Sequence, residues 1–181
     1  SCTGNGTALT WNTYTNEDAT IISGIYAGSN YGSDPRLQVG LKSVIGPTAK
    51  FLIDFNVSNY IPQGANVIEA TLRLYLEEIH GTSPAIYIGW VTGSWGQSSV
   101  TWNSSASASY YTARSHSLPS SLGYVYLDVT PEVQKMVDLG LNEGFKIWSA
   151  NESTVAWVEF SSRENPNSSS RSAYLVVEYT P

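Results

Sequence analysis

Apolar and polar residues alternate with a period of two along most of this chain, and this pattern constrains the fold more than any other. Every odd-numbered residue from Phe51 to Val57 is apolar, and so is every even-numbered residue from Ile68 to Leu76. Successive side chains of a β-strand point to opposite faces, so each stretch predicts a strand with one buried face. The other face carries residues such as Asp54 and Arg73.

Shorter runs with the same alternation predict further strands at residues 36–41, 85–88, 124–129, 144–148, 155–160 and 173–179. Clusters rich in Gly, Pro, Asn and Ser separate them at residues 27–35, 60–66, 81–84 and 163–170. Such clusters supply the residues that a reversing backbone needs. Strands at this spacing predict an all-β fold, an antiparallel sandwich or barrel.

One short helix is predicted among the strands, at residues 131–139. Thr130 suits the N-cap, Pro131 suits the first helical position, and Gly140 can adopt the left-handed conformation that ends a helix. Three apolar residues recur on one face: Val133, Met136 and Val137. We expect this helix to close one end of a sandwich.

The strands follow one another without a linker or an internal repeat, so residues 18–181 predict a single domain. Residues 1–17 show no alternation. They are predicted to form an N-terminal extension that Trp11 pins to the domain.

The composition favours a secreted or cell-surface protein. Charged residues make up 13% of the chain, while Ser, Thr, Asn, Gly and Tyr are abundant. The net charge of −6 and the nine scattered Lys and Arg residues argue against nucleic acid and against an anionic membrane surface as partners. No apolar run approaches the roughly 20 residues that span a bilayer.

Two further features bear on the compartment. Cys2 stands alone, which excludes an intrachain disulfide and leaves a lipid attachment, an interchain thiol or no role at all. No signal peptide opens the chain, so a secreted form requires a signal that has been removed or that lies in a larger precursor. Asn-x-Ser/Thr sequons, which are compatible with secretion, begin at Asn5, Asn56, Asn103, Asn151 and Asn167.

A set of short segments occurs in a specific order: residues 30–32, 37–40, 51–55, 61–75, 100–103, 128–130 and 160–164, with Trp95 before the fifth. In order and spacing they resemble the DNRLRE domain, a disaggregatase-related family of secreted domains similar to carbohydrate-binding modules. The resemblance covers residues 18–179. The family usually has an acid between its tryptophans, where this chain has Gln97.

The resemblance implies a jelly-roll-like sandwich of the kind found beside polysaccharide-active enzymes and in repeated arrays on archaeal and bacterial surfaces. It implies a polysaccharide or a cell-surface glycan as the partner, and a place within a larger multidomain protein. It does not imply one ligand for all members.

Trp95 and Trp102 stand seven residues apart in an otherwise polar stretch. They are predicted to anchor this connection onto the core, since burying an indole contributes about 1.5 to 3 kcal/mol by area. The alternative is a surface for a flat ligand such as a sugar ring.

The sequence offers no identifiable catalytic mechanism, so we expect no enzyme. His80 and His116 lie in polar stretches without a nucleophile elbow or a metal-binding pair, and both are expected to be solvated. The carboxylate pairs Glu77/Glu78 and Glu17/Asp18 are sequence neighbours, which point to opposite faces of a strand.

No cofactor is expected, although structural calcium stays open. Four aspartates can supply oxygen ligands: Asp18, Asp34, Asp54 and Asp128. No EF-hand-like spacing supports such a site. Arg163 is expected to fasten the end of a sheet through hydrogen bonds, with an acidic sugar as its alternative partner.

The strongest candidate site lies in a predicted hairpin over residues 144–160. A turn at Asn151 and Glu152 pairs Ile147 with Ala156 and Phe145 with Val158, and these four residues and Phe160 then face the core. The opposite face carries Lys146, Trp148, Val155, Trp157 and Glu159.

Two indoles, a cation and an anion on one face are typical of a sugar-binding sheet, because indoles stack on pyranose rings and polar groups hold the hydroxyls. Alternatively a loop covers this face, or a register slip turns it inwards. Trp90 and Tyr87 are secondary candidates, because a bulge after Ile88 would expose the indole.

Two functions follow from these observations. One is a noncatalytic extracellular polysaccharide-binding module, and the other is a structural or adhesive spacer of a cell-surface protein. Solvent-accessible Trp148 or Trp157 favours the first, and complete packing of every tryptophan favours the second.

Overall fold

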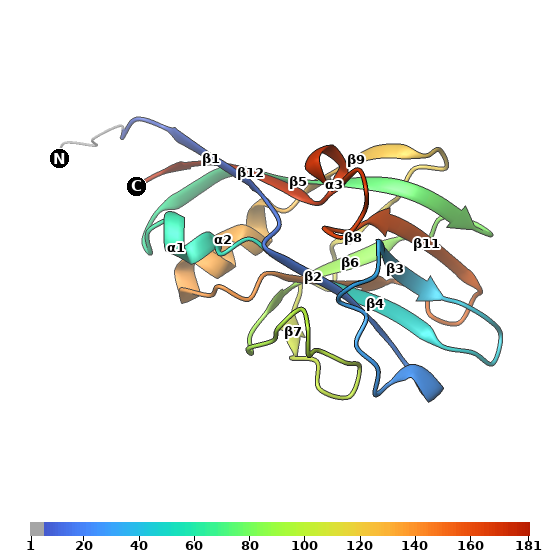
Figure 1. Cartoon of the computed structure of the whole chain (residues 1–181). Coiled ribbons are helices and arrows are strands. Elements are labelled where there is room, and N and C mark those ends of the chain that lie inside the picture. Colours follow the sequence, from blue (N-terminus) through green and yellow to red (C-terminus); the bar gives the residue numbers. More distant parts are fainter. Residues whose placement is uncertain (1–5) are drawn as a thin grey trace.

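The alternating segments form one antiparallel sheet that folds over itself into a sandwich (Figure 1). The computed structural model describes residues 6–181, so Cys2 and the sequon at Asn5 lie outside the described residues. The first layer contains β1 (Leu9–Tyr14), β3 (Arg36–Leu41), β5 (Asn66–His80), β9 (Gly123–Asp128), β11 (Ala156–Ser161) and β12 (Tyr174–Thr180). The second contains β2 (Glu17–Ile22), β4 (Thr48–Asp54), β6 (Ile86–Val91), β7 (Ala108–Ser109), β8 (Ser115–His116) and β10 (Phe145–Ser149). The predicted all-β fold is confirmed.

The two layers enclose the main core. A single residue pair, Gly40 with Ala49, joins β3 of the first layer to β4 of the second. Across the interface Phe51 of β4 meets Phe160 of β11, with ring centroids 5.8 Å apart. Both rings are fully buried. Burying such a ring contributes roughly 1.5 to 3 kcal/mol, so the alternating phenylalanines hold the layers together.

A second, smaller core lies on the outer face of the second layer. Ala19 and Ile21 of β2 and Leu52 of β4 are buried there with Val91 and Val100. The connection after β6 crosses this face and packs two tryptophans on it, Trp95 and Trp102. The Trp95 indole also donates a hydrogen bond of 2.8 Å to the Glu143 carbonyl. This packing agrees with the predicted anchoring role of both tryptophans.

The predicted helix is present as α2 (Thr130–Leu139), and Gly140 ends it with a φ of 64°. Thr130 is the first helical residue, and Val129 occupies the N-cap position that we had predicted for Thr130. Three one-turn helices were not predicted: η1 (Gly24–Tyr26), α1 (Val57–Tyr60) and α3 (Ser168–Arg171). Figure 1 shows α1 and α2 at the end of the sandwich that carries the C-terminus, as expected for a helix that closes one end. Within residues 6–181, no helix has the length and apolar character needed to cross a membrane.

The segment predicted as an N-terminal extension contributes strands. β1 pairs with β12 from Leu9 opposite Tyr179 to Tyr14 opposite Tyr174. The Trp11 ring stacks on Tyr60 with centroids 5.2 Å apart, which agrees with the predicted role of Trp11 as a pin. As an edge strand, β1 buries little of either face, which explains why its sequence does not alternate clearly.

The predicted pairing of residues 144–160 is wrong. β10 pairs with β4 and β6, whereas β11 pairs with β3 and β5. Phe145 therefore lies opposite Ile53 and Trp90, and Val158 lies opposite Val39 and Ile79. The connection after β10 passes from one layer to the other. In these two strands alternation assigns the core-facing side chains correctly, but it does not choose the neighbouring strand.

Candidate functional site

The structure separates the six predicted site residues into three places. Lys146 and Trp148 of β10 share the outer face of the second layer with Tyr87 of β6. Trp157 and Glu159 of β11 lie on the outer face of the first layer. Trp90 lines the main core and is only 7% exposed, so the bulge that would expose its indole is absent from β6.

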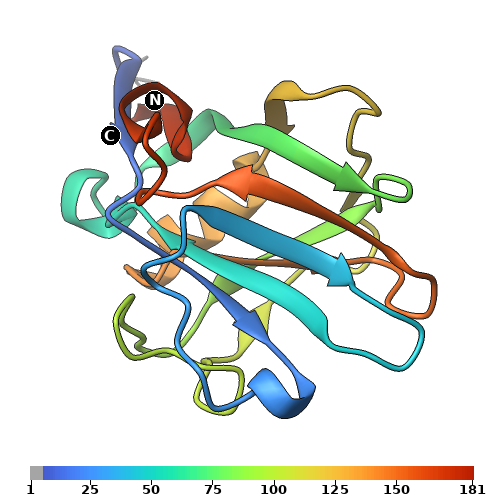
Figure 2. The ribbon, with the colours of Figure 1, turned by 45° about the vertical axis from the view of Figure 1, so that its right-hand side comes forward.

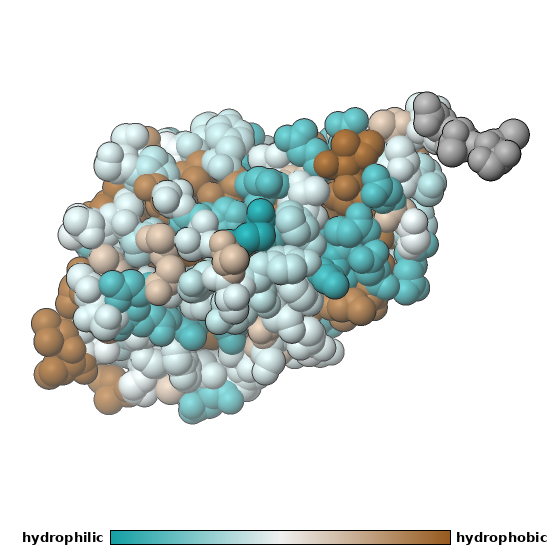
Figure 3. Space-filling view, turned by 180° about the vertical axis from the view of Figure 1, so that it is seen from behind, coloured by the Kyte–Doolittle hydropathy of each residue, from teal (hydrophilic) through white to brown (hydrophobic). Residues whose placement is uncertain are grey.

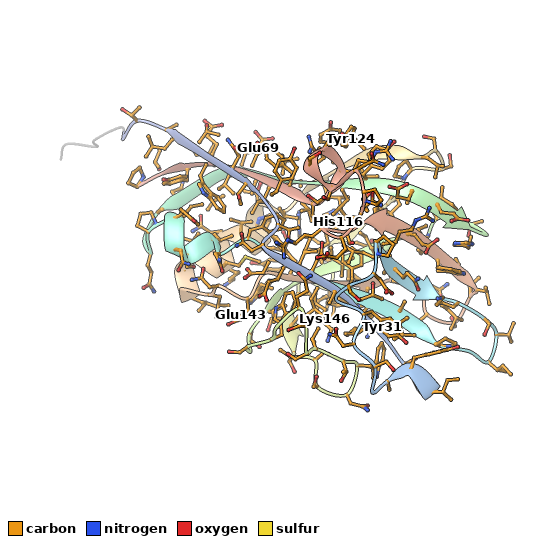
Figure 4. The ribbon with its side chains drawn as sticks, in the orientation of Figure 1. Tyr31, Glu69, His116, Tyr124, Glu143 and Lys146 are labelled. Carbon is orange, nitrogen blue, oxygen red and sulfur yellow. The ribbon has the colours of Figure 1, made fainter. Side chains whose placement is uncertain are left out.

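Strand pairing places the first three residues together. In the ladder between β10 and β6, Trp148 lies opposite Tyr87 and Lys146 lies opposite Gly89. Opposite residues of adjacent strands point to the same face. In Figure 4 Lys146 lies near the loop that carries β7, whereas Tyr124, which belongs to β9, lies on the far side of the sandwich.

Three aromatic rings contact one another on this face. The Trp148 and Tyr87 centroids are 6.0 Å apart, and Tyr110 meets Trp148 edge-on at 4.8 Å and Tyr87 at 5.2 Å. Tyr110 follows β7, and the sequence analysis missed it because it lies in a loop with no alternation. Such edge-to-face contacts contribute about 0.5 to 1.5 kcal/mol beyond area burial, so the rings hold one another in place.

Gly89 leaves the space that Trp148 occupies. A Cβ atom at position 89 would lie 3.0 Å from the Trp148 ring and 2.7 Å from the carbonyl oxygen of Ser109. The glycine therefore allows both the indole and β7 to approach β6 closely.

Two lysines accompany the rings. The Lys146 ammonium donates hydrogen bonds to the Ser105 hydroxyl at 2.9 Å and to the Ala106 carbonyl at 3.1 Å. Burial, and then the charge of Lys50, lower the pKa of Lys146 below its usual value. Lys50 lies 4.9 Å above the Trp102 ring and 3.7 Å from the Glu152 carboxylate. The sequence analysis did not single out Lys50.

An open hollow of about 240 Å³ lies among these side chains, and we call it the aromatic groove. Its lining residues are Lys50, Ala108, Tyr110, Lys146 and Trp148. Tyr87 does not line the groove but contacts the rings of Tyr110 and Trp148. Its volume lies below the roughly 300 to 1,000 Å³ of pockets that enclose drug-sized ligands. A groove of this size and openness suits a ring that rests on the surface.

Trp157 has a different environment on the first layer. One face of its indole stacks on His80, with centroids 3.6 Å apart, and the Lys42 ammonium lies 4.4 Å from the ring centroid. Protein groups therefore already contact the indole on two sides. The Glu159 carboxylate meets Arg36 at 3.2 Å and His80 at 3.0 Å, so it belongs to an ion-pair network.

Within residues 6–181, one group of side chains has the spacing of metal ligands. Glu78, His80 and Glu159 place ligand atoms within 4.8 Å of one another. Arg36 already binds this group, with its guanidinium 2.6 Å from Glu78 and 3.2 Å from Glu159. A cation supplied by the chain thus already pairs with both carboxylates.

The four aspartates considered for calcium lie apart from this group. Asp54 accepts hydrogen bonds from the backbone of Phe55 and Asn56, at 2.7 and 3.0 Å. Asp128 accepts one from the Thr130 backbone at 3.0 Å.

The other two aspartates differ from these. Asp18 is 1% exposed and accepts a 2.8 Å hydrogen bond from the Arg163 backbone, and Asp34 borders a hollow beside β3. The Arg163 guanidinium donates to Gln97 at 2.9 Å, which agrees with its predicted fastening role.

The histidines are less solvated than expected. His80 is held between Trp157 and Glu159, and the Nε2 atom of His116 is buried without a hydrogen-bond partner among the described residues. Burial lowers the pKa of His116 below its usual value.

The chain matches a known protein family. The model of carbohydrate-binding module family 96 matches residues 8–179, which covers nearly the whole chain and includes β1. A search of curated proteins finds no match.

Proposed function

The chain belongs to carbohydrate-binding module family 96, and from this premise we propose that it is a noncatalytic, extracellular polysaccharide-binding module whose glycan lies in the aromatic groove. The resemblance to DNRLRE domains supports the same role. The low charge and the abundance of Ser, Thr and Asn support the extracellular location.

The observation that carries the site is the pair of rings Tyr110 and Trp148, which line an open groove and are both in contact with Tyr87. The apolar face of a pyranose ring can stack on an indole or a phenol. Lys50 and Lys146 border the same hollow, where an ammonium donates hydrogen bonds to sugar hydroxyls or to a sugar carboxylate. The groove thus offers both stacking and polar contacts.

The groove also supports a noncatalytic role. The side chains that line it are Lys50, Ala108, Tyr110, Lys146 and Trp148, which include no carboxylate and no histidine. Glycoside hydrolysis ordinarily requires a pair of carboxyl groups about 5 to 10 Å apart across the scissile bond. The groove therefore lacks the carboxyl pair of an ordinary glycoside hydrolase, which supports a binding role.

A glycan array followed by calorimetric titration of any hit tests this proposal. We expect Trp148→Ala and Tyr110→Ala each to weaken binding by about 1 to 3 kcal/mol, taking the stacking of nucleic-acid bases on aromatic rings as the analogue. Tyr126→Ala is the control, since it removes an exposed aromatic ring on β9 of the opposite layer, and Tyr126 does not line the groove.

Two results would contradict the proposal. If Trp148→Ala and Tyr110→Ala bind the hit as the unmodified protein does, the groove is not the site. If no glycan binds, the alternative function as a structural or adhesive spacer takes precedence.

A further inference from the structure

A second and larger hollow lies among the loops beside β3. It has a volume of about 400 Å³ and is lined mainly by Tyr26, Tyr31, Asp34, Gln38 and Lys42. We call it the loop pocket. Tyr26 ends η1, Tyr31 and Asp34 lie in the connection to β3, and Gln38 lies on β3 itself. The aromatic groove has no lining residue in common with it.

The pocket contains both a hydrogen-bond acceptor and a donor. Asp34 faces it with a carboxylate that forms no ion pair within 4.0 Å in the described part of the chain, and burial raises the pKa of this carboxyl. The Lys42 ammonium donates to the Gln38 amide oxygen at 2.6 Å and lies 4.4 Å from the Trp157 ring centroid. These contacts fix the ammonium at the pocket wall before any ligand arrives.

The charges indicate which ligand fits. A carboxylate in the wall repels an anionic group, while it accepts hydrogen bonds from hydroxyls. An ammonium and an amide complement it as donors. Tyr26, which is 41% exposed, and Tyr31 add aromatic surface for the apolar face of a ring. This combination fits an uncharged sugar.

The rim of the pocket is apolar. Ile25, Val44 and Ile45 are 91%, 86% and 100% exposed, more than any other large hydrophobic residue in the described chain. In the sequence Ile25 directly precedes the lining residue Tyr26, and Val44 and Ile45 follow the lining residue Ser43. Figure 3 shows apolar side chains that project at the end of the molecule opposite the grey N-terminal residues, and Figure 2 shows η1 and the loop after β3 at the rim of the sandwich.

Three aliphatic side chains in water on adjacent loops indicate a surface that contacts a partner. A polysaccharide has the required chemistry, because one sugar unit can fill the polar pocket while the C–H faces of its neighbours cover the apolar rim.

We propose that the loop pocket is a second carbohydrate-binding site, specific for uncharged hexopyranose units, and that the protein therefore binds glycans at two separate places. This inference rests on the proposed function as a polysaccharide-binding module. It goes beyond that function because it assigns a second binding site, with its own sugar specificity, to residues outside the aromatic groove.

Amide-resolved NMR titration of the full chain tests the second site. The probes are three uncharged hexasaccharides: cellohexaose, laminarihexaose and mannohexaose. We expect at least one of them to shift signals of residues 24–47, and we expect these shifts to persist in Trp148→Ala. In Tyr31→Ala and Asp34→Ala the affinity at this site should fall about tenfold or more, which is the effect of losing one stacking or charge-assisted contact.

Tyr126→Ala is the control, because Tyr126 is a 66% exposed tyrosine on β9 that lies outside both hollows. Thermal melting of each variant shows whether it is folded. The second site is overturned if no hexasaccharide shifts residues 24–47 at millimolar concentration, or if Tyr31→Ala and Asp34→Ala leave the affinity unchanged.

Self-association is the competing explanation for the rim. It would overturn the proposal if the protein dimerises in solution and Val44→Ser with Ile45→Ser abolishes the dimer. Failure of the proposed function is a separate result, because it appears as an unchanged affinity in Trp148→Ala and Tyr110→Ala.

Discussion

The imidazole of His80 lies parallel to the indole of Trp157, with ring centroids 3.6 Å apart and an interplanar angle of 11°. The Lys42 ammonium lies 4.4 Å from the same indole. This tryptophan therefore stabilises a contact between β5 and β11, whereas Trp148 borders an open groove. The two tryptophans that alternation placed together have separate roles.

Replacing Trp157 with Ala should lower the stability of the fold. The variant loses the stack on His80 and the cation–π contact with Lys42, and a cost of about 2 kcal/mol is expected for a half-buried indole. Trp148→Ala should shift the melting temperature by only a few degrees. Thermal melting of the two variants side by side measures the difference, and equal destabilisation would mean that Trp148 is part of the core.

Replacing Trp95 with Ala should cost more than either of these changes. The indole packs on the second core and donates a hydrogen bond to the Glu143 carbonyl, so the variant leaves a void and an unpaired acceptor. Removing a fully buried tryptophan typically costs about 3 to 5 kcal/mol, and because Trp95 is partly buried we expect about 3 kcal/mol. Urea unfolding measures this cost. A loss below about 1 kcal/mol would show that the connection after β6 is not anchored by this residue.

Asp18 should make the stability depend on pH. Burial raises the pKa of its carboxyl from 3.8 to about 7, and its Oδ1 atom has no hydrogen-bond partner within residues 6–181. Between these two pH values the folded protein binds a proton that the unfolded chain has released. The contribution of this group to the free energy of unfolding is therefore largest below about pH 4 and falls as the pH rises to about 7.

Asp18→Asn removes this titration. Relative to the unmodified protein, the variant should gain stability as the pH rises from 4 to 8, by roughly 2 to 4 kcal/mol, since one pKa unit corresponds to about 1.4 kcal/mol. Asp54, whose pKa burial raises to about 6, is present in both proteins and cancels in the difference. Urea unfolding at several pH values measures the effect, and a pH-independent difference would contradict it.

Much of the fold could be predicted from the alternation of apolar and polar residues, because the face of the strand on which a side chain lies mainly decides whether it is buried. Phe51, Ile53, Leu72 and Leu74 are all buried as predicted. Ile68 departs from the pattern and is 45% exposed, whereas Val67 is 7% exposed. The pairing of β5 with β12 shifts by one residue at this point, and such a bulge reverses which side chains face inwards.

The candidate site was harder to predict because it combines elements that are distant in the sequence. Tyr110 comes from a loop, and Lys50 comes from a strand whose pairing with β10 no local pattern reveals. Trp148 was found because alternation correctly placed it on an outer face. Its partners depend on strand order, which is set by the packing of the whole core.

Replacing Gln97 with Glu should lower the stability of the fold, although DNRLRE domains usually have an acid at this position. Its amide donates hydrogen bonds to the Gly32 carbonyl at 2.8 Å and to the Glu164 carboxylate at 2.9 Å. Gln97→Glu loses both donors and places a negative charge beside Glu164. We expect a loss of about 1 to 3 kcal/mol at pH 8, which Gln97→Met should match only in part because it adds no charge.

The salt dependence separates the lost hydrogen bonds from the added charge. Glu164 is exposed, so its repulsion of the introduced carboxylate should weaken at high ionic strength, where salt screens exposed charges, and the two variants should converge there. Urea unfolding at low and at high salt, both at pH 8, measures this convergence. A stabilising effect of Gln97→Glu at pH 8 would show that the Arg163 guanidinium, 2.9 Å from the Gln97 oxygen, outweighs the lost donors.

Gly89→Ala should weaken glycan binding although Gly89 itself does not line the aromatic groove. The new Cβ would lie 2.7 Å from the Ser109 carbonyl and 3.0 Å from the Trp148 ring, so either β7 or the indole must move. Tyr110 directly follows Ser109, and any shift of β7 displaces this ring as well. We expect roughly a tenfold loss of affinity and a stability cost of about 1 to 3 kcal/mol.

Gly28→Ala is the control, because a Cβ there meets nothing within 4 Å. Titration with the glycan hit and thermal melting measure both effects, and unchanged affinity in Gly89→Ala would show that the positions of Trp148 and Tyr110 do not determine binding.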